Sequence, residues 1–142
     1  MESALLGVVL DSSVLIAAER RMLNPAQTIK NVRQAVGELP LVLSSMTVAE
    51  VGHGIYRAHS QEIRDRRRAF LDEFEATITI HPVTEATAEI IARIGGEQAT
   101  LGVNLPLADL IIGACALELG YAVATSNARD FNRIPGLTLV SL

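Results

Sequence analysis

Short apolar runs recur along the chain, and longer stretches with apolar residues at helical spacing lie between them. Runs of this length suit buried strands, and the longer stretches suit helices that cover a sheet. The predicted strands are Val8–Leu10, Leu41–Leu43, Ile78–Ile80, Tyr121–Ala124 and Leu137–Val140. Because strands and helices alternate, the pattern predicts an α/β fold with a central, mainly parallel β-sheet flanked by helices.

Cap and breaker residues give the helix boundaries. Asn24-Pro25 separates a helix from Ser13 to about Arg21 from a second helix that ends near Glu38. Four further helices are predicted. One begins at a capping box of Thr47 and Glu50, a second spans about Gln61–Ala76, and a third begins after Thr84. The fourth spans Leu107–Leu119, with Gly120 as its C-cap.

Composition fits one domain over residues 1–142. A chain of this length buries roughly 70% of its unfolded surface. Apolar residues make up 49% of the chain, aromatic residues only 4%, and Trp is absent, so the core is predicted to be aliphatic. The single cysteine, Cys115, excludes an internal disulfide, and its apolar helix predicts a buried thiol.

The net charge and the N-terminal segment limit the classes of protein to which this chain can belong. The formal net charge is -4, so the total charge does not indicate nucleic-acid binding. Glu2 precedes an apolar stretch from Ala4 to Leu10 that is too short for a signal peptide or a membrane span. We therefore expect a soluble cytoplasmic protein.

Acidic and polar residues follow several of the predicted strands. Asp11 closes the first strand, Glu50 follows the second, and Asp109 interrupts the apolar start of a helix. Asn127 and Asp130 follow the strand that ends at Ala124. Since ligands of parallel α/β sheets bind beyond the carboxyl ends of the strands, we expect these groups near one edge of the sheet.

Each acid also has a purely structural interpretation. Asp11 or Ser12 could cap the first helix, Glu50 could complete the capping box with Thr47, and Asp109 could face the positive end of a helix dipole. Asp109 argues most strongly for a site, because its helix is apolar nearly all round and is therefore predicted to be buried. A buried acid needs a partner, and a metal ion is a natural one.

A group of carboxylates indicates a hard divalent cation. Two carboxylates about 5 Å apart repel by roughly 3 kcal/mol at an effective dielectric constant near 20, which either raises a pKa or attracts a cation. Oxygen ligands suit Mg²⁺ or Mn²⁺. Zinc is disfavoured because His53, His59 and His81 form no ligand motif with Cys115.

The same residues resemble a known family. Val9-Leu10-Asp11-Ser12-Ser13 resembles the opening motif of PIN-domain ribonucleases. Glu50 after Ser-x-x-Thr-x-x, and Ala108-Asp109 at the start of an apolar helix, match the second and third acids of that family. The segment from Thr125 to Phe131, followed by Ile134-Pro135-Gly136-Leu137, resembles the closing segment of VapC-type toxins of bacterial type II toxin–antitoxin pairs. The resemblance spans nearly the whole chain.

The resemblance implies an endoribonuclease that depends on Mg²⁺ or Mn²⁺ and hydrolyses RNA phosphodiester bonds with a metal-activated water. Asp11, Glu50 and Asp109 carry over as metal ligands. The fourth position, often acidic in the family, is Asn127, whose amide oxygen binds a metal more weakly. Asp130 lies three residues further on and could substitute for it or assist it.

The resemblance also implies partners. A small antitoxin is expected to cover the site, and homodimers are usual in the family. Apolar residues between Leu39 and Ile55 are candidates for an interface or, alternatively, for the core. Ser13 and Thr125 could position a carboxylate or a metal-bound water, or could be ordinary turn residues.

Other α/β functions fit the sequence less well. A phosphoryl-receiving domain needs an acid pair after the first strand and a late lysine, but no lysine follows Lys30. A haloacid-type phosphatase needs a second acid where Ser13 stands. The stronger alternative is a non-catalytic PIN-like module that binds RNA or protein, because Asn127 weakens the expected acid set.

Arginines are concentrated between Arg57 and Arg68. The simplest interpretation is a solvated helix face. Arg67, however, falls inside the apolar stripe of its predicted helix, so its stem could follow the edge of that stripe or its guanidinium could bind a phosphate or a carboxylate. Arg67 and Arg68 are therefore the sequence candidates for contacts with RNA.

Overall fold

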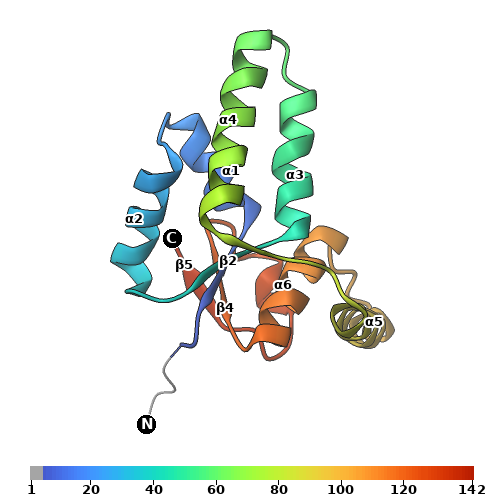
Figure 1. Cartoon of the computed structure of the whole chain (residues 1–142). Helices are drawn as coiled ribbons and strands as arrows, with labels where there is room; N and C mark the ends of the chain where they lie inside the picture. The colour runs from blue at the N-terminus through green and yellow to red at the C-terminus, as the bar shows by residue number, and fades with distance from the viewer. Residues whose placement is uncertain (1–4) are drawn as a thin grey trace.

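The computed structural model describes residues 5–142, and a five-stranded parallel sheet runs through its centre (Figure 1). The order β3-β2-β1-β4-β5 places β1 in the middle, paired with β2 and β4. The strands are β1 (Val8–Leu10), β2 (Leu41–Ser44), β3 (Thr79–His81), β4 (Ala122–Thr125) and β5 (Leu139–Ser141). All neighbouring strands pair in parallel, so the predicted α/β class is confirmed.

Successive side chains of β1 point to opposite faces of the sheet, and both faces are apolar. Helices therefore cover both faces. Val8 and Leu10 face one core, whereas Val9 faces the other. The first core is covered by α1 (Ser12–Arg20), α2 (Pro25–Val36), α3 (Ser45–Tyr56) and α4 (Gln61–Thr77). The second is covered by α5 (Glu85–Thr100), α6 (Leu107–Leu119) and the 3₁₀ turn η1 (Phe131–Arg133).

Several predicted boundaries are confirmed by their caps. Thr84 caps α5 by accepting the Thr87 N–H, and Gly120 ends α6 in a left-handed conformation with φ of 70°. The second helix ends at Val36, two residues before the predicted Glu38. The three later strands begin one or two residues after their predicted starts.

The predicted capping box of Thr47 and Glu50 is wrong. Helix α3 begins at Ser45, and the hydroxyl of Ser44 accepts the Met46 N–H at 3.1 Å. The buried hydroxyl of Thr47 instead donates to the Leu10 carbonyl at 3.4 Å and so ties α3 to β1. Glu50 therefore has no capping role and lies inside the helix.

The apolar residues between Leu39 and Ile55 belong mainly to the core. Leu41, Leu43, Val51 and Ile55 are all buried in the cluster beneath α1 to α4. Of the two roles that the sequence allowed for this segment, the structure thus supports packing.

Cys115 lies in α6 and is 1% exposed, as its apolar surroundings predict. Burial raises the pKa of this thiol to about 12, so the side chain is neutral near pH 7. Cys115 therefore acts as a small core residue.

Residues 1–4, in which the predicted N-terminal apolar stretch begins, lie outside the described residues. Within residues 5–142, none of the helices combines the length and apolar character that crossing a bilayer requires.

Candidate active site

Asp11 is a buried carboxylate at the carboxyl end of the central strand, 4% exposed. It occupies the N-cap position of α1, but its side chain makes no capping hydrogen bond, so the capping interpretation is wrong. Its Oδ2 instead accepts the hydroxyls of Ser13 at 2.7 Å and Thr125 at 2.9 Å. Both hydroxyls therefore fix the orientation of this carboxylate, and one of them comes from the end of β4.

Ser12 joins Asp11 to Glu50. Its Oγ donates to Glu50 Oε1 at 2.9 Å and lies 3.4 Å from Asp11 Oδ1. Burial raises the pKa of Glu50 above its usual value, the Ser12 hydrogen bond lowers it, and the charge of Asp11 raises it. Sequence reasoning considered Ser12 only as a cap; the available signal was its position beside an acid that ends a strand.

Asp109 carries the clearest electrostatic mark of the site. It lies in the first turn of α6, and its pKa is raised from 3.8 to about 6. Burial is the largest cause, followed by the charges of Asp11, Asp130 and Glu50. A helix dipole would favour the ionised carboxylate here, so burial and acidic neighbours outweigh it. Four acids from separate segments therefore share one electrostatic environment.

Asn127 and Asp130 both follow β4 but differ in their relation to the acids. The Asn127 N–H donates to Thr125 Oγ1 at 2.9 Å, and the residue is exposed. Asp130 is half-buried at the start of η1, and its charge raises the pKa of Asp109 more than that of Glu50 does. Asp130 is thus the residue of this segment whose charge acts on the acid group.

The acids lie near one another but do not form a preassembled set of metal ligands. Within the described range 5–142, no three Asp, Glu, His or Cys side chains already lie close enough together to hold an ion. Burial is the main cause of the raised pKa of Asp109 and the charges of three other acids add to it, so a cation bound among these acids would favour the ionised form. Since the donors are carboxylate and hydroxyl oxygens, the residues fit Mg²⁺ or Mn²⁺ by their chemistry.

His81 lies apart from the acid group. Its Nε2 is 3.0 Å from Oε2 of Glu118, whose other oxygen accepts the hydroxyl of buried Thr87. These contacts join β3, α5 and α6.

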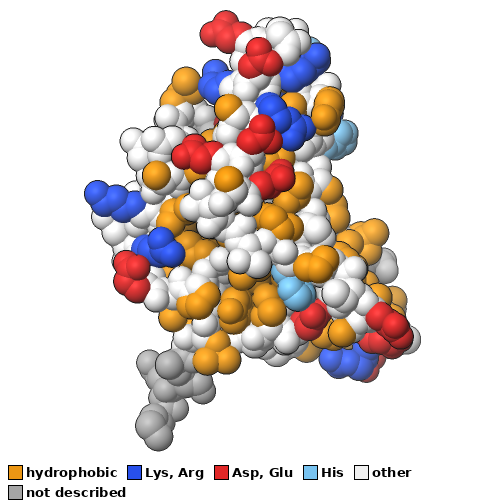
Figure 2. All heavy atoms as spheres, in the orientation of Figure 1, with side chains coloured by type: hydrophobic (Ala, Val, Ile, Leu, Met, Phe, Trp, Pro, Cys, Tyr) orange, Lys and Arg blue, Asp and Glu red, His pale blue; other side chains and the backbone are white. Residues whose placement is uncertain are grey.

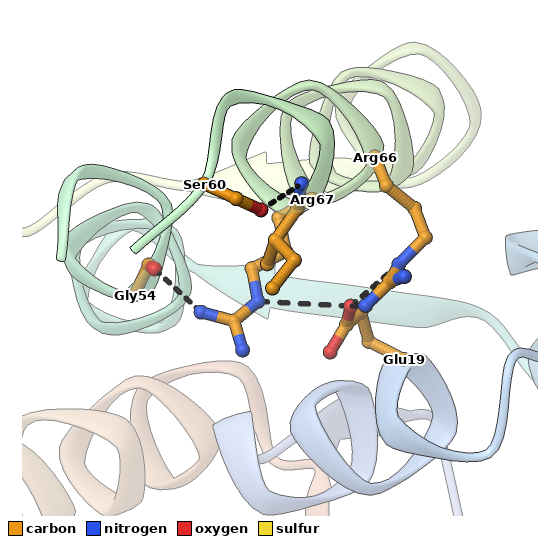
Figure 3. A network of polar contacts seen from close by, with 6 residues as sticks. Glu19, Gly54, Ser60, Arg66 and Arg67 are labelled. Carbon is orange, nitrogen blue, oxygen red and sulfur yellow. Dashed lines mark hydrogen bonds and ion pairs between the residues drawn. The ribbon is translucent and has the colours of Figure 1, made fainter. Parts of the chain in front are cut away.

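The arginines that sequence reasoning considered for RNA are already bound within the chain. Arg67 Nη1 donates to the Gly54 carbonyl at 2.8 Å, and its Nε lies 3.6 Å from Glu19 Oε1 (Figure 3). Arg68 contacts Asp72 at 3.4 Å and the Tyr56 hydroxyl at 3.1 Å. Figure 2 shows acidic and basic side chains interspersed over the upper part of the molecule, where Figure 1 places α3 and α4. This supports a solvated, internally paired helix face.

Comparison with protein families gives one clear match. The sequence profile of the PIN domain matches residues 8–137. The chain is 30% identical over 141 residues to a protein from Rickettsia bellii named ribonuclease VapC, with 96% of this chain and 97% of that protein covered. It is 29% identical over 116 residues to a Shigella flexneri protein named tRNA(fMet)-specific endonuclease VapC, with 78% and 86% covered.

Solved structures show the same fold. The VapBC2 structure from Rickettsia felis, bound to a promoter DNA fragment, contains a chain that matches with a TM-score of 0.81 at 20% identity, covering 95% of this chain and 98% of that chain. The DNA-bound VapBC structure from Salmonella typhimurium contains a chain that matches with a TM-score of 0.79 at 23% identity, covering 96% and 98%.

Proposed function

Because the chain belongs to the PIN-domain family and within it to the VapC ribonucleases, we propose that it is an Mg²⁺- or Mn²⁺-dependent endoribonuclease and the toxin of a type II toxin–antitoxin pair. The observation that carries the proposal is the shared electrostatic environment of Asp11, Glu50, Asp109 and Asp130 at one end of the sheet. Such a group of acids repels RNA unless a cation neutralises it, and a metal-dependent hydrolase binds a cation at this position.

Asp11, Glu50 and Asp109 would hold the ion, with Asp130 as the fourth acid and Asn127 as a weaker alternative at its side. When bound, the ion supplies a Lewis acid that lowers the pKa of a water molecule and stabilises charge on phosphate oxygens. Asp11 is preorganised for this task, since two hydroxyls fix its Oδ2. Ser12 keeps Glu50 oriented beside it.

The partners follow from the family. The proposed substrate is RNA, the proposed location is the cytoplasm, and the proposed inhibitor is a small antitoxin protein. The Rickettsia felis and Salmonella typhimurium neighbours are VapBC structures, which supports such a partner. We also propose a homodimer, on the family resemblance alone.

The direct test is RNA cleavage by purified protein in Mg²⁺, in Mn²⁺ and in a chelator. Loss of a metal ligand should cost more than the roughly 10- to 100-fold that loss of a supporting residue costs, so we expect Asp11→Asn and Asp109→Asn each to reduce cleavage by about 100-fold or more. Asp65→Asn, an exposed acid on α4, is the matched control and should keep full activity. Circular dichroism should show that all three variants fold.

A different result would favour the non-catalytic alternative. If the folded wild-type protein cleaves no RNA in either metal, or if cleavage is equal in Asp11→Asn, the acid group is not a nuclease site. RNA or protein binding without cleavage would then identify the chain as a PIN-like binding module.

A further inference from the structure

A small cavity lies between α1, α3 and α4, directly beside the acid group. Its volume is about 120 Å³, and Glu50 forms part of its wall. The floor is apolar, with Leu15 and Phe70 buried, and two exposed arginines also line the cavity, Arg20 in α1 and Arg57 just after α3. The cavity therefore adjoins the proposed metal site at Glu50, and its lining holds three arginines against two glutamates, Glu19 and Glu50.

The third arginine that lines this cavity, Arg67, makes its contacts within the protein. Glu19 Oε1 lies 3.0 Å from Arg66 Nη2 and 3.6 Å from Arg67 Nε, so one largely buried carboxylate serves two arginines (Figure 3). Arg67 also binds the Gly54 carbonyl in the last turn of α3. This network holds the Arg67 guanidinium in place and engages its Nε and Nη1 in contacts within the chain.

Arg20 and Arg57 differ from this pair. Both are exposed, Arg20 in the last turn of α1 and Arg57 just after α3. Among the described residues, neither side chain takes part in an ion pair within 4.0 Å. They are thus free to bind an anion at the edge of an otherwise acidic site.

The size and charge of the cavity indicate its ligand. Pockets for drug-sized ligands measure roughly 300–1,000 Å³, so this cavity admits a single chemical group. A guanidinium binds phosphate through two parallel hydrogen bonds, and the apolar floor suits the sugar or base attached to that phosphate. An RNA strand crossing the acids needs such an anchor, because the acids alone repel its backbone.

We propose that this cavity is a substrate subsite, in which Arg20 and Arg57 bind an RNA phosphate adjacent to the one that is cleaved. The inference rests on the proposed ribonuclease function and adds the residues that hold the strand. It moves the expected RNA contacts from Arg67 and Arg68, which are bound within the chain, to the two arginines that are not.

The test measures cleavage of a fluorogenic RNA oligonucleotide at several salt concentrations. We expect Arg20→Gln and Arg57→Gln each to raise KM about tenfold with little change in kcat, and each to reduce the slope of log KM against log salt by about one. Arg57→Lys should retain most of the slope because it keeps the charge. Arg33→Gln, which removes an exposed arginine of α2 paired with Glu38, should change neither quantity.

The outcomes separate this inference from the function on which it rests. If wild-type protein does not cleave RNA, the ribonuclease function fails. If it cleaves but Arg20→Gln and Arg57→Gln keep the wild-type KM and salt slope, the subsite is overturned. The subsite is also overturned if these variants keep the RNA parameters and lose only inhibition by a bound protein, because the cavity then belongs to that partner.

Discussion

At the scale of single residues, the fold disfavours the charged form of Asp109. Burial and the nearby charges of Asp11, Asp130 and Glu50 disfavour its ionised form, which is why its pKa rises to about 6. A bound cation would favour the ionised form again. If the proposed metal binds, the pKa of Asp109 should therefore fall.

The raised pKa predicts how the metal-free protein responds to pH. Folded Asp109 binds a proton more tightly than the unfolded chain does, so its stabilising effect is complete below pH 3.8 and is lost as pH rises through about 6. Asn has no such titration. In a chelator, we expect wild-type protein to lose stability relative to Asp109→Asn between pH 4 and pH 7, measured by urea unfolding.

Asp65→Asn is the control for this comparison, since it removes an exposed acid of α4. Its stability should follow that of wild-type protein over the same pH range. Parallel curves for wild-type protein and Asp109→Asn would contradict the prediction, because they would mean that Asp109 titrates alike in the folded and unfolded chains.

How much of the site the sequence could predict depends on whether a contact is local. Asp11 was predicted at a strand end, because the end of an apolar run is a local signal. The Ser12–Glu50 hydrogen bond could not be predicted, since it depends on how the end of β1 meets α3. The two hydroxyls on Asp11 Oδ2 differ in the same way: Ser13 is two residues away, whereas Thr125 comes from β4.

At the scale of elements, a glycine at the end of a helix and a glycine inside a helix have different effects on stability. Gly120 ends α6 with φ of 70°, a conformation that costs a residue with a side chain about 1–2 kcal/mol. Gly96 lies inside α5, and a Cβ added there would meet nothing within 4 Å. The two positions therefore form a matched pair within one protein.

We expect the same substitution to have opposite effects at these two sites. Gly120→Ala should lower the free energy of unfolding by about 1–2 kcal/mol, and Gly96→Ala should raise it by about 0.5–1 kcal/mol. Urea unfolding of both variants measures the difference. If Gly120→Ala were neutral, α6 would have another way to end, and the left-handed cap would not contribute to stability.

Element type and order were predictable because each element carries its own signal. Thr84 and Gly120 mark helix ends through local hydrogen bonding and backbone conformation, and both predictions hold. The predicted start of α3 is wrong because two hydroxyl residues lie close together in the sequence and only one caps the helix. Ser44 accepts the Met46 N–H, whereas Thr47 donates to the Leu10 carbonyl of β1. The strand order was not predictable, since the short aliphatic strands contain no pattern that selects their neighbours.

At the scale of the whole molecule, an acid group lies beside helices on which acidic and basic side chains are interspersed. The chain is acidic overall, with a net charge of -4, and its acid group lies at the carboxyl end of the central strand. Basic side chains lie on the helices beside it, and several are paired with acids of the same helices or neighbouring ones. With the proposed metal site and subsite, RNA binding should depend on metal ions at the acids and on Arg20 and Arg57, and hence on both metal and salt concentration.

The group of acids predicts that metal binding stabilises the whole fold. A ligand that binds only the folded state at 100 times its Kd adds about 2.7 kcal/mol to the free energy of unfolding. We expect Mn²⁺ to produce a gain of this kind in wild-type protein and in Asp65→Asn, and to produce little gain in Asp11→Asn, measured by urea unfolding at pH 8. Asp109, whose pKa is about 6, is ionised at that pH, so a cation has its full charge to pair with. An equal gain in Asp11→Asn would mean that Mn²⁺ binds elsewhere on the acidic surface, because the only change is the loss of one carboxylate charge from the site.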